Sequence, residues 1–187
     1  WIATYAAIEK RFGGLHVLVN NAGVVLNADV EDTSLEKFRW VNAIMTDGVF
    51  LGMKHAIPLM NKSGGGSIII TSSIGGIRGR GQGNSAYIAS KHAEVGLMRT
   101  ASNECAPHGI RVNCVAPGPT ETRMIRNIEE GRSPGAPQKA RDALLAALPM
   151  KRYSTPEEVA NVALFLCSPL ASYVSGQTIE VNGGWRG

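Results

Sequence analysis

The chain has 187 residues, of which 44% are hydrophobic and 18% are charged, and it carries a formal net charge of +4. This length and apolar content suit one domain with a sizeable core. The modest charge, with Lys and Arg scattered along the chain, argues against nucleic acid as a partner, and apolar runs far shorter than about 20 residues argue against a membrane span.

Short apolar runs alternate with amphipathic segments along the chain. The predicted elements, in order, are a helix at 1–12, a strand at 15–20, a helix at 34–61, a strand at 67–71, a helix at 84–106, a strand at 111–115, helices at 138–148 and 155–167, and a strand at 178–181. The opening segment has the pattern of the second half of a helix, so we expect the chain to begin in the middle of a fold.

Two helix starts carry strong local signals. Ser34 can cap the long helix, which we expect to be interrupted near Gly48 and Gly52. Thr155 is followed by Pro156, which combines a cap with proline at the first helical position, and two acidic residues come next.

Strands that alternate with helices indicate parallel βαβ units and therefore an α/β fold with a doubly wound, Rossmann-like sheet. Functional groups in such a sheet gather at the carboxyl ends of the strands. Three polar or glycine-containing segments follow predicted strands, namely Asn21–Gly23, Ser72-Ser73 and Pro117–Thr122. Residues 1–187 are predicted to form a single partial domain, in which the charged stretch at about 119–153, broken by Gly and Pro, is a flexible loop on the substrate side.

The cysteines and histidines point away from metal binding. Cys105, Cys114 and Cys167 are odd in number, widely spaced and without a CxxC pair, so neither a disulfide framework nor a zinc site is predicted. We interpret them as buried small side chains in a reducing cytoplasm. The four histidines lack metal-ligand spacing, and no metal site is predicted.

The most informative pair is Tyr87 and Lys91, four residues apart in a predicted helix. Positions i and i+4 lie on one helix face, so the ammonium would lie beside the phenol. A neighbouring cation favours the phenolate and lowers the tyrosine pKa. The pair therefore predicts a general acid/base, and we expect its pKa to fall below that of free tyrosine.

Several motifs in a fixed order resemble the short-chain dehydrogenase/reductase family over the whole chain. They are Val17–Gly23, Val41-Asn42, Ser67–Ser73, Tyr87–Lys91, Ile110–Thr122 and Val174–Gly184. The resemblance implies an enzyme that interconverts a secondary alcohol and a ketone by hydride transfer with NAD or NADP. The spacing of 14 between Ser73 and Tyr87 is one more than usual in the family, and Asn182 stands where the family commonly has aspartate.

The resemblance also implies roles for individual residues. Tyr87 would exchange a proton with the substrate oxygen, Lys91 would lower the tyrosine pKa and bind the nicotinamide ribose, Ser73 would polarise the carbonyl, and Asn42 would hold a water that relays protons to Lys91. Ser72 is the weaker candidate, because adjacent strand positions point to opposite sides. The cofactor-binding residues implied by the family pattern are Asn21, Ala22, Gly23, Tyr87, Lys91, Pro117, Gly118, Thr120 and Thr122.

A glycine-rich segment, Gly75–Gly81, formally fits the GxxxGxG phosphate motif of the family. The next helix is predicted to begin too late for its amides to meet a phosphate. We interpret the segment as a flexible loop beside the substrate, with Arg78 and Arg80 solvated. Because no other such motif occurs, the chain resembles roughly the last two-thirds of a family member, and the residue that separates NAD from NADP is missing.

Two alternatives remain beside an alcohol–ketone oxidoreductase. One is a non-catalytic or incomplete module of the same family that acts as a scaffold, and the other is a halohydrin lyase of related fold, against which Lys91 argues. The expected partners are a small alcohol or ketone and other copies of the chain in a homotetramer or homodimer. Small residues on the helices at 34–61 and 84–106, such as Gly48, Gly52, Ala89 and Ala93, would allow these helices to pair with their symmetry mates.

Overall fold

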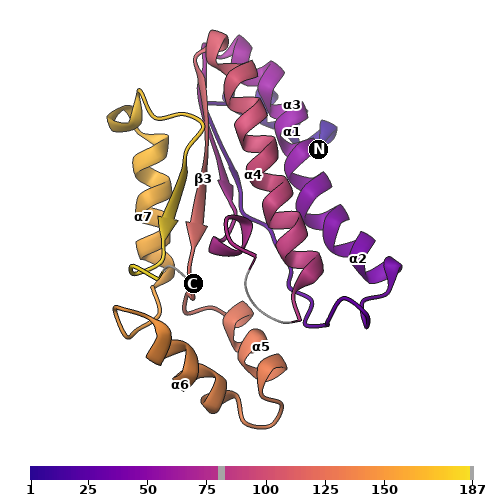
Figure 1. Ribbon diagram of the computed structural model, residues 1–187. Helices are drawn as coiled ribbons and strands as arrows, with labels where there is room; N and C mark the ends of the chain where they lie inside the picture. Colours follow the sequence, from indigo (N-terminus) through magenta and orange to yellow (C-terminus); the bar gives the residue numbers. More distant parts are fainter. Residues whose placement is uncertain (80–82, 186–187) are drawn as a thin grey trace.

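The computed structural model describes residues 1–79 and 83–185 (Figure 1). Its strands are β1 (Val17–Asn20), β2 (Gly66–Thr71), β3 (Ile110–Pro117) and β4 (Thr178–Val181). Its α-helices are α1 (Ile2–Phe12), α2 (Leu35–Asn42), α3 (Gly48–Lys62), α4 (Ser85–Cys105), α5 (Arg123–Arg132), α6 (Pro137–Ala147) and α7 (Pro156–Cys167). None of the helices in these two ranges is both long and apolar enough to cross a membrane.

The four strands form one parallel sheet in the order β1-β2-β3-β4. Helices connect consecutive strands, as parallel pairing requires. The α/β, doubly wound, Rossmann-like fold predicted from the alternation of elements is therefore confirmed. β3 is longer than predicted and carries its last residue, Pro117, to the same edge of the sheet at which β1 and β2 end.

Helices cover both faces of this sheet (Figure 1). Ile68 and Ile70 of β2 pack into the apolar cluster shared with α1, α3 and α4, whereas Ile69 points to the opposite face and packs near Leu166 of α7. This alternation along one strand places a core on each side, which explains why β2 reads as a continuous apolar run.

The long helix predicted from Ser34 is present but divided. The Ser34 side chain accepts a hydrogen bond from the Lys37 amide, and the break is a π-helical turn, η1 (Ala43–Asp47), that separates α2 from α3. Gly52 does not mark the break. A side chain at Gly52 would come within 2.5 Å of Asn20 Oδ1, so this glycine allows α3 to approach β1.

The charged stretch at 119–153 is not the long flexible loop expected from its composition. It contains two helices, α5 and α6, of which only the second was predicted. Their apolar sides share a small cluster that includes Ile125, Leu144 and Tyr153. Figure 1 shows both helices beyond the carboxyl ends of the strands, where they wall the site described next.

Candidate active site

A pocket of about 750 Å³ lies at the carboxyl ends of the strands. The turns after β1, β2 and β3, the first turns of α4, and helices α5 and α6 line it. All the residues predicted to bind the cofactor line this pocket: Asn21, Ala22, Gly23, Tyr87, Lys91, Pro117, Gly118, Thr120 and Thr122. Of the four predicted catalytic residues, Ser73, Tyr87 and Lys91 line it and Asn42 does not.

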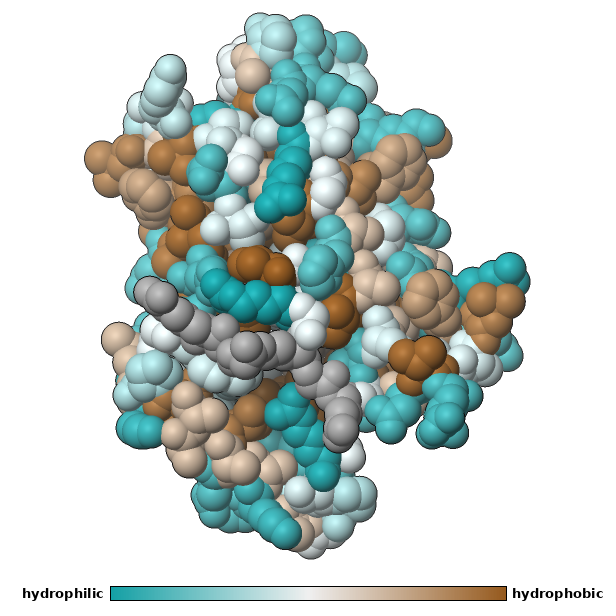
Figure 2. Space-filling view, viewed as in Figure 1, coloured by the Kyte–Doolittle hydropathy of each residue, from teal (hydrophilic) through white to brown (hydrophobic). Residues whose placement is uncertain are grey.

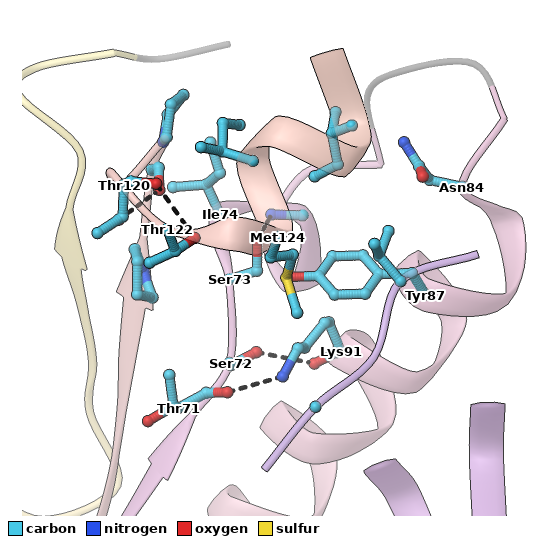
Figure 3. A pocket seen from close by; sticks show the side chains of 18 of the residues that line it. Thr71, Ser72, Ser73, Ile74, Asn84, Tyr87, Lys91, Thr120, Thr122 and Met124 are labelled. Carbon is cyan, nitrogen blue, oxygen red and sulfur yellow. Dashed lines mark hydrogen bonds between the residues drawn. The ribbon is translucent and has the colours of Figure 1, made fainter. Parts of the chain in front are cut away.

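Ser73 and Tyr87 meet where β2 ends and α4 begins (Figure 3). The Ser73 hydroxyl accepts a hydrogen bond from the Gly75 amide at 3.0 Å. It also acts on the Tyr87 phenol, whose pKa it lowers. The neighbouring Ser72 turns away and donates to the Lys91 carbonyl at 3.0 Å. Ser73 was preferred over Ser72 because adjacent side chains along a strand point to opposite sides. The structure agrees, since Ser73 and not Ser72 acts on the Tyr87 phenol.

The glycines after β2 have a packing role. A side chain at Gly76 would lie 2.6 Å from the Lys91 carbonyl oxygen, and one at Gly75 would lie 2.6 Å from Ile88 Cδ1. This loop can therefore press against α4 only because these positions lack a Cβ. The close packing fixes the distance between Ser73 and the helix that carries Tyr87.

Arg78, in the same loop, is not simply solvated as predicted. Its guanidinium forms two hydrogen bonds to Glu180 of β4, at 2.6 and 2.8 Å. This bidentate pair ties the loop after β2 to the last strand across the pocket. The other arginine of that prediction, Arg80, lies outside the described residues.

The Lys91 ammonium lies behind the phenol, 5.6 Å from the centre of the Tyr87 ring. It donates to the Thr71 carbonyl at 2.7 Å (Figure 3). It also contacts both carboxylate oxygens of Glu94 at 3.1 Å. Lys91 is 4% exposed and Glu94 is 1% exposed. Glu94 was missed in the sequence, although its position three residues after Lys91 places both side chains on one helix face.

The Tyr87 pKa is raised above that of free tyrosine, which is opposite to the direction predicted. Burial is the main cause, the Ser73 hydrogen bond acts against it, and the charge of Glu94 raises the pKa further. Burial also lowers the pKa of Lys91. The sequence showed the cation but not the loss of water around the phenol or the buried carboxylate that offsets the cation.

Asn42 points along its own helix, away from the pocket. Its amide donates to the Phe38 carbonyl at 3.0 Å and its side-chain oxygen accepts from Thr46 at 3.1 Å. Met45 of η1 is fully buried, lies close to the pocket residue Gly23, and accepts a hydrogen bond from Ser90 on its sulfur at 3.4 Å. The structure therefore does not place Asn42 where it could relay protons to Lys91.

The turns after β1 and β3 form the rest of the polar rim. A side chain at Gly23 would lie 3.7 Å from Met45 Cε and 3.9 Å from Lys91 Nζ, so the missing side chain keeps the Lys91 face of the pocket open. Thr120 shares a 2.8 Å hydrogen bond with Ser154, and Thr122 donates to the Thr120 carbonyl at 3.3 Å. The hydroxyls, amides and ammonium that line this pocket fit a nicotinamide dinucleotide, whose ribose and carboxamide need such donors.

Comparisons with known proteins agree with this geometry. The family model described as enoyl-(acyl carrier protein) reductase matches residues 1–186. Levodione reductase of Leifsonia aquatica is 38% identical over 183 residues, which make up 97% of this chain and 68% of that protein.

Solved structures give the same result. The crystal structure of levodione reductase has a TM-score of 0.94 at 37% identity and covers 97% of this chain and 70% of its own. The crystal structure of NAD⁺-bound xylitol dehydrogenase has a TM-score of 0.91 at 29% identity and covers 98% of this chain and 74% of its own. The chain belongs to the short-chain dehydrogenase/reductase family.

Proposed function

We propose that the protein is an NAD(P)-dependent oxidoreductase that interconverts a secondary alcohol and a ketone, with Tyr87 as the general acid/base. The observation that carries the proposal is the cluster of Ser73, Tyr87 and Lys91 in one pocket, with the Lys91 ammonium 5.6 Å from the centre of the Tyr87 ring. Membership in a family of oxidoreductases supports the same reaction class. The chain spans 68% of levodione reductase, so activity is proposed for the full-length protein.

The chain's own residues would handle the proton. In the direction of ketone reduction, the Ser73 hydroxyl and the Tyr87 phenol would donate hydrogen bonds to the carbonyl oxygen, and the phenol would then release its proton to that oxygen. The raised pKa keeps the phenol protonated at neutral pH, which suits a general acid. The Lys91 ammonium, 5.6 Å from the ring centre, would stabilise the phenolate that remains.

A bound nicotinamide would supply or accept the hydride at the carbon next to that oxygen. The turns at Asn21–Gly23 and Pro117–Thr122, together with Lys91, would hold this cofactor, which we propose to be NAD or NADP. The fit of these donors to the pocket and the NAD⁺-bound state of the xylitol dehydrogenase structure support the assignment.

The substrate side of the pocket is mostly apolar. Its walls include Ile74, Ile88, Met124, Ile125, Leu144 and Trp185. Such a lining favours a small ring or chain with few polar groups beyond the reacting oxygen. We therefore propose small, largely apolar secondary alcohols and ketones as substrates.

Replacing Tyr87 by Phe tests the assignment. We expect turnover to fall at least about 100-fold, because the proton donor is lost, while NADH binding followed by fluorescence stays within a few-fold. Tyr173→Phe is the matched control, since Tyr173 is fully exposed and does not line the pocket. Turnover of Tyr87→Phe within a few-fold of the unmodified enzyme would rule out the proposed role.

A further inference from the structure

We propose that Glu94 is a positioning residue that holds the Lys91 ammonium and offsets its charge, and thereby controls how readily the Tyr87 phenol ionises. This inference rests on the proposed function. It concerns the one acidic side chain that contacts Lys91 among the described residues.

The contacts fix the position of the ammonium beside the phenol ring. Two carboxylate oxygens of Glu94 and the Thr71 carbonyl oxygen lie within hydrogen-bonding distance of Lys91 Nζ. Lys91 and Glu94 are both nearly inaccessible to water, so the attraction between them is weakly screened. The charge that Tyr87 experiences is therefore that of the pair and not of Lys91 alone.

The groups that surround the pair from other elements leave this balance undisturbed. From β3 comes the Cys114 thiol, whose pKa is raised to about 12 by burial and by Glu94, so it is neutral at physiological pH. From η1 comes the thioether of Met45, which cannot carry charge, and from β2 comes the Thr71 carbonyl. Arg99, farther along α4, acts on Cys114 and lowers the pKa of its thiol.

The carboxylate can change its charge near neutral pH. Burial raises the pKa of Glu94 to about 7, against the opposing effect of Lys91. Above that pH the pair is a carboxylate with an ammonium, and its negative member raises the Tyr87 pKa. Below it Glu94 is protonated, and the Lys91 charge acts on the phenol without an offset.

The test is a titration of the Tyr87 phenol by ¹³C NMR of the ring Cζ in the full-length protein, with the signal assigned by its loss in Tyr87→Phe. Removing the carboxylate charge in Glu94→Gln should lower the phenol pKa by about one unit. Glu94→Asp keeps the charge and should stay close to the unmodified protein. Glu129→Gln is the matched control, because Glu129 is also buried in ion pairs but belongs to the α5–α6 cluster.

The rate of alcohol oxidation should rise with pH, and in Glu94→Gln the pH of this rise should fall by the same amount as the phenol pKa. A packing defect would instead lower the rate at every pH and leave the pH of the rise unchanged. An unchanged or raised phenol pKa in Glu94→Gln would overturn the inference. If the variant does not fold, the unmodified protein decides: its Tyr87 signal should show a small second step near pH 7, and a titration without that step would overturn the inference.

The NMR titration needs no turnover, which separates the two proposals. A lowered phenol pKa in a protein that oxidises no alcohol would leave the role of Glu94 standing and remove the proposed function. Normal hydride transfer together with an unchanged phenol pKa in Glu94→Gln would leave the proposed function standing and remove the role of Glu94.

Discussion

At the Tyr87 phenol, burial and hydrogen bonding act in opposite directions. Loss of water raises its pKa, and the Ser73 hydroxyl lowers it by bonding to the oxygen. The protonated form therefore dominates through the neutral range. Ketone reduction, which uses the phenol as an acid, should be nearly independent of pH there, whereas alcohol oxidation needs the phenolate and should rise with pH.

Lys91→Met tests the contribution of the cation to this pH dependence. Removing the ammonium takes away the charge that favours phenolate, so the alkaline rise of alcohol oxidation should move to higher pH or disappear. The measurement is kcat for oxidation against pH at saturating cofactor, with the circular dichroism spectrum as a check that the variant is folded. An unchanged profile would show that Lys91 does not influence the base.

The residues of the site that could be predicted are those fixed by local geometry. Tyr87 and Lys91 share a helix face, and Ser73 follows from the alternation of a strand, so the structure brings these three together. Asn42 was misplaced because it ends α2, before the π-helical turn η1 begins, and its side chain bonds to Phe38 and Thr46 on the neighbouring turns. The contact of Glu94 with Lys91 could not be predicted from the sequence, because its importance depends on the burial of both side chains. That burial results from β2 and β3 packing over α4.

Among the elements, α7 begins with the most completely bonded helix start. The Thr155 hydroxyl accepts the Glu158 amide, and the Glu158 carboxylate accepts the Thr155 amide at 2.8 Å. Arg152 adds two hydrogen bonds to the same carboxylate. The sequence predicted this start, because a capping box lies within four residues and needs no distant partner.

Thr155→Ala should lower the free energy of unfolding by about 1 kcal/mol, because the amides of the first turn lose their acceptor. Urea unfolding followed by circular dichroism measures the change. Ser154→Ala is not a suitable control, since Ser154 bonds to Thr120, whereas Ser172→Ala on the surface changes a hydroxyl outside this helix start. Equal stabilities of Thr155→Ala and the unmodified protein would contradict the cap.

Helix α5 could not be predicted because long-range ion pairs hold it. Glu129, nearly fully buried, bonds to Arg126 of its own helix and to Tyr153 at 2.9 Å, and lies 3.8 Å from Arg141 of α6. Arg126 and Arg141 also both bond to Glu121. A charged sequence interrupted by Gly131 suggests a loop until these partners are brought together in space.

At the scale of the whole molecule, the described sheet has an apolar edge at β1. Val17 and Val19 are 43% and 48% exposed, and within the described residues β1 pairs with β2 alone. A strand edge of this kind offers unpaired amides and carbonyls to other chains. This edge is where we expect residues 1–187, produced by themselves, to associate.

Val19→Lys should reduce that association, because a charge on an edge strand opposes pairing with a second edge. Light scattering of residues 1–187 measures it. Val30→Lys is the control, since Val30 is also exposed but lies outside the strand. A monodisperse unmodified chain that binds NADH at micromolar concentration would refute the expectation.

Exposed apolar side chains on two sets of helices are candidate contacts for the homo-oligomer expected from the sequence. Figure 2 shows hydrophobic side chains reaching the surface, and the exposed ones include Leu35, Trp40 and Phe50 on α2 and α3 and Leu164 on α7. Exposed apolar residues that gather on helices often mark contacts between subunits.

We expect Trp40→Glu combined with Phe50→Glu to convert the full-length protein to a smaller species in light scattering, while the active-site residues stay in place. Leu164→Glu tests the alternative in which α7 forms the contact. A full-length protein that is monomeric at micromolar concentration without any substitution would remove the proposed assembly.

Helices α5 and α6 lie outside the sheet, and this placement affects how the substrate preference can change. Tyr87, Lys91 and Ser73 are anchored on β2 and α4, whereas much of the apolar wall comes from two helices with their own small cluster, inserted between β3 and α7. Mutations in this insert can alter which molecule fits without moving the proton-handling groups. We therefore expect that grafting the segment from Arg123 to Ala147 of another family member changes the substrate preference and leaves the proposed proton transfer in place.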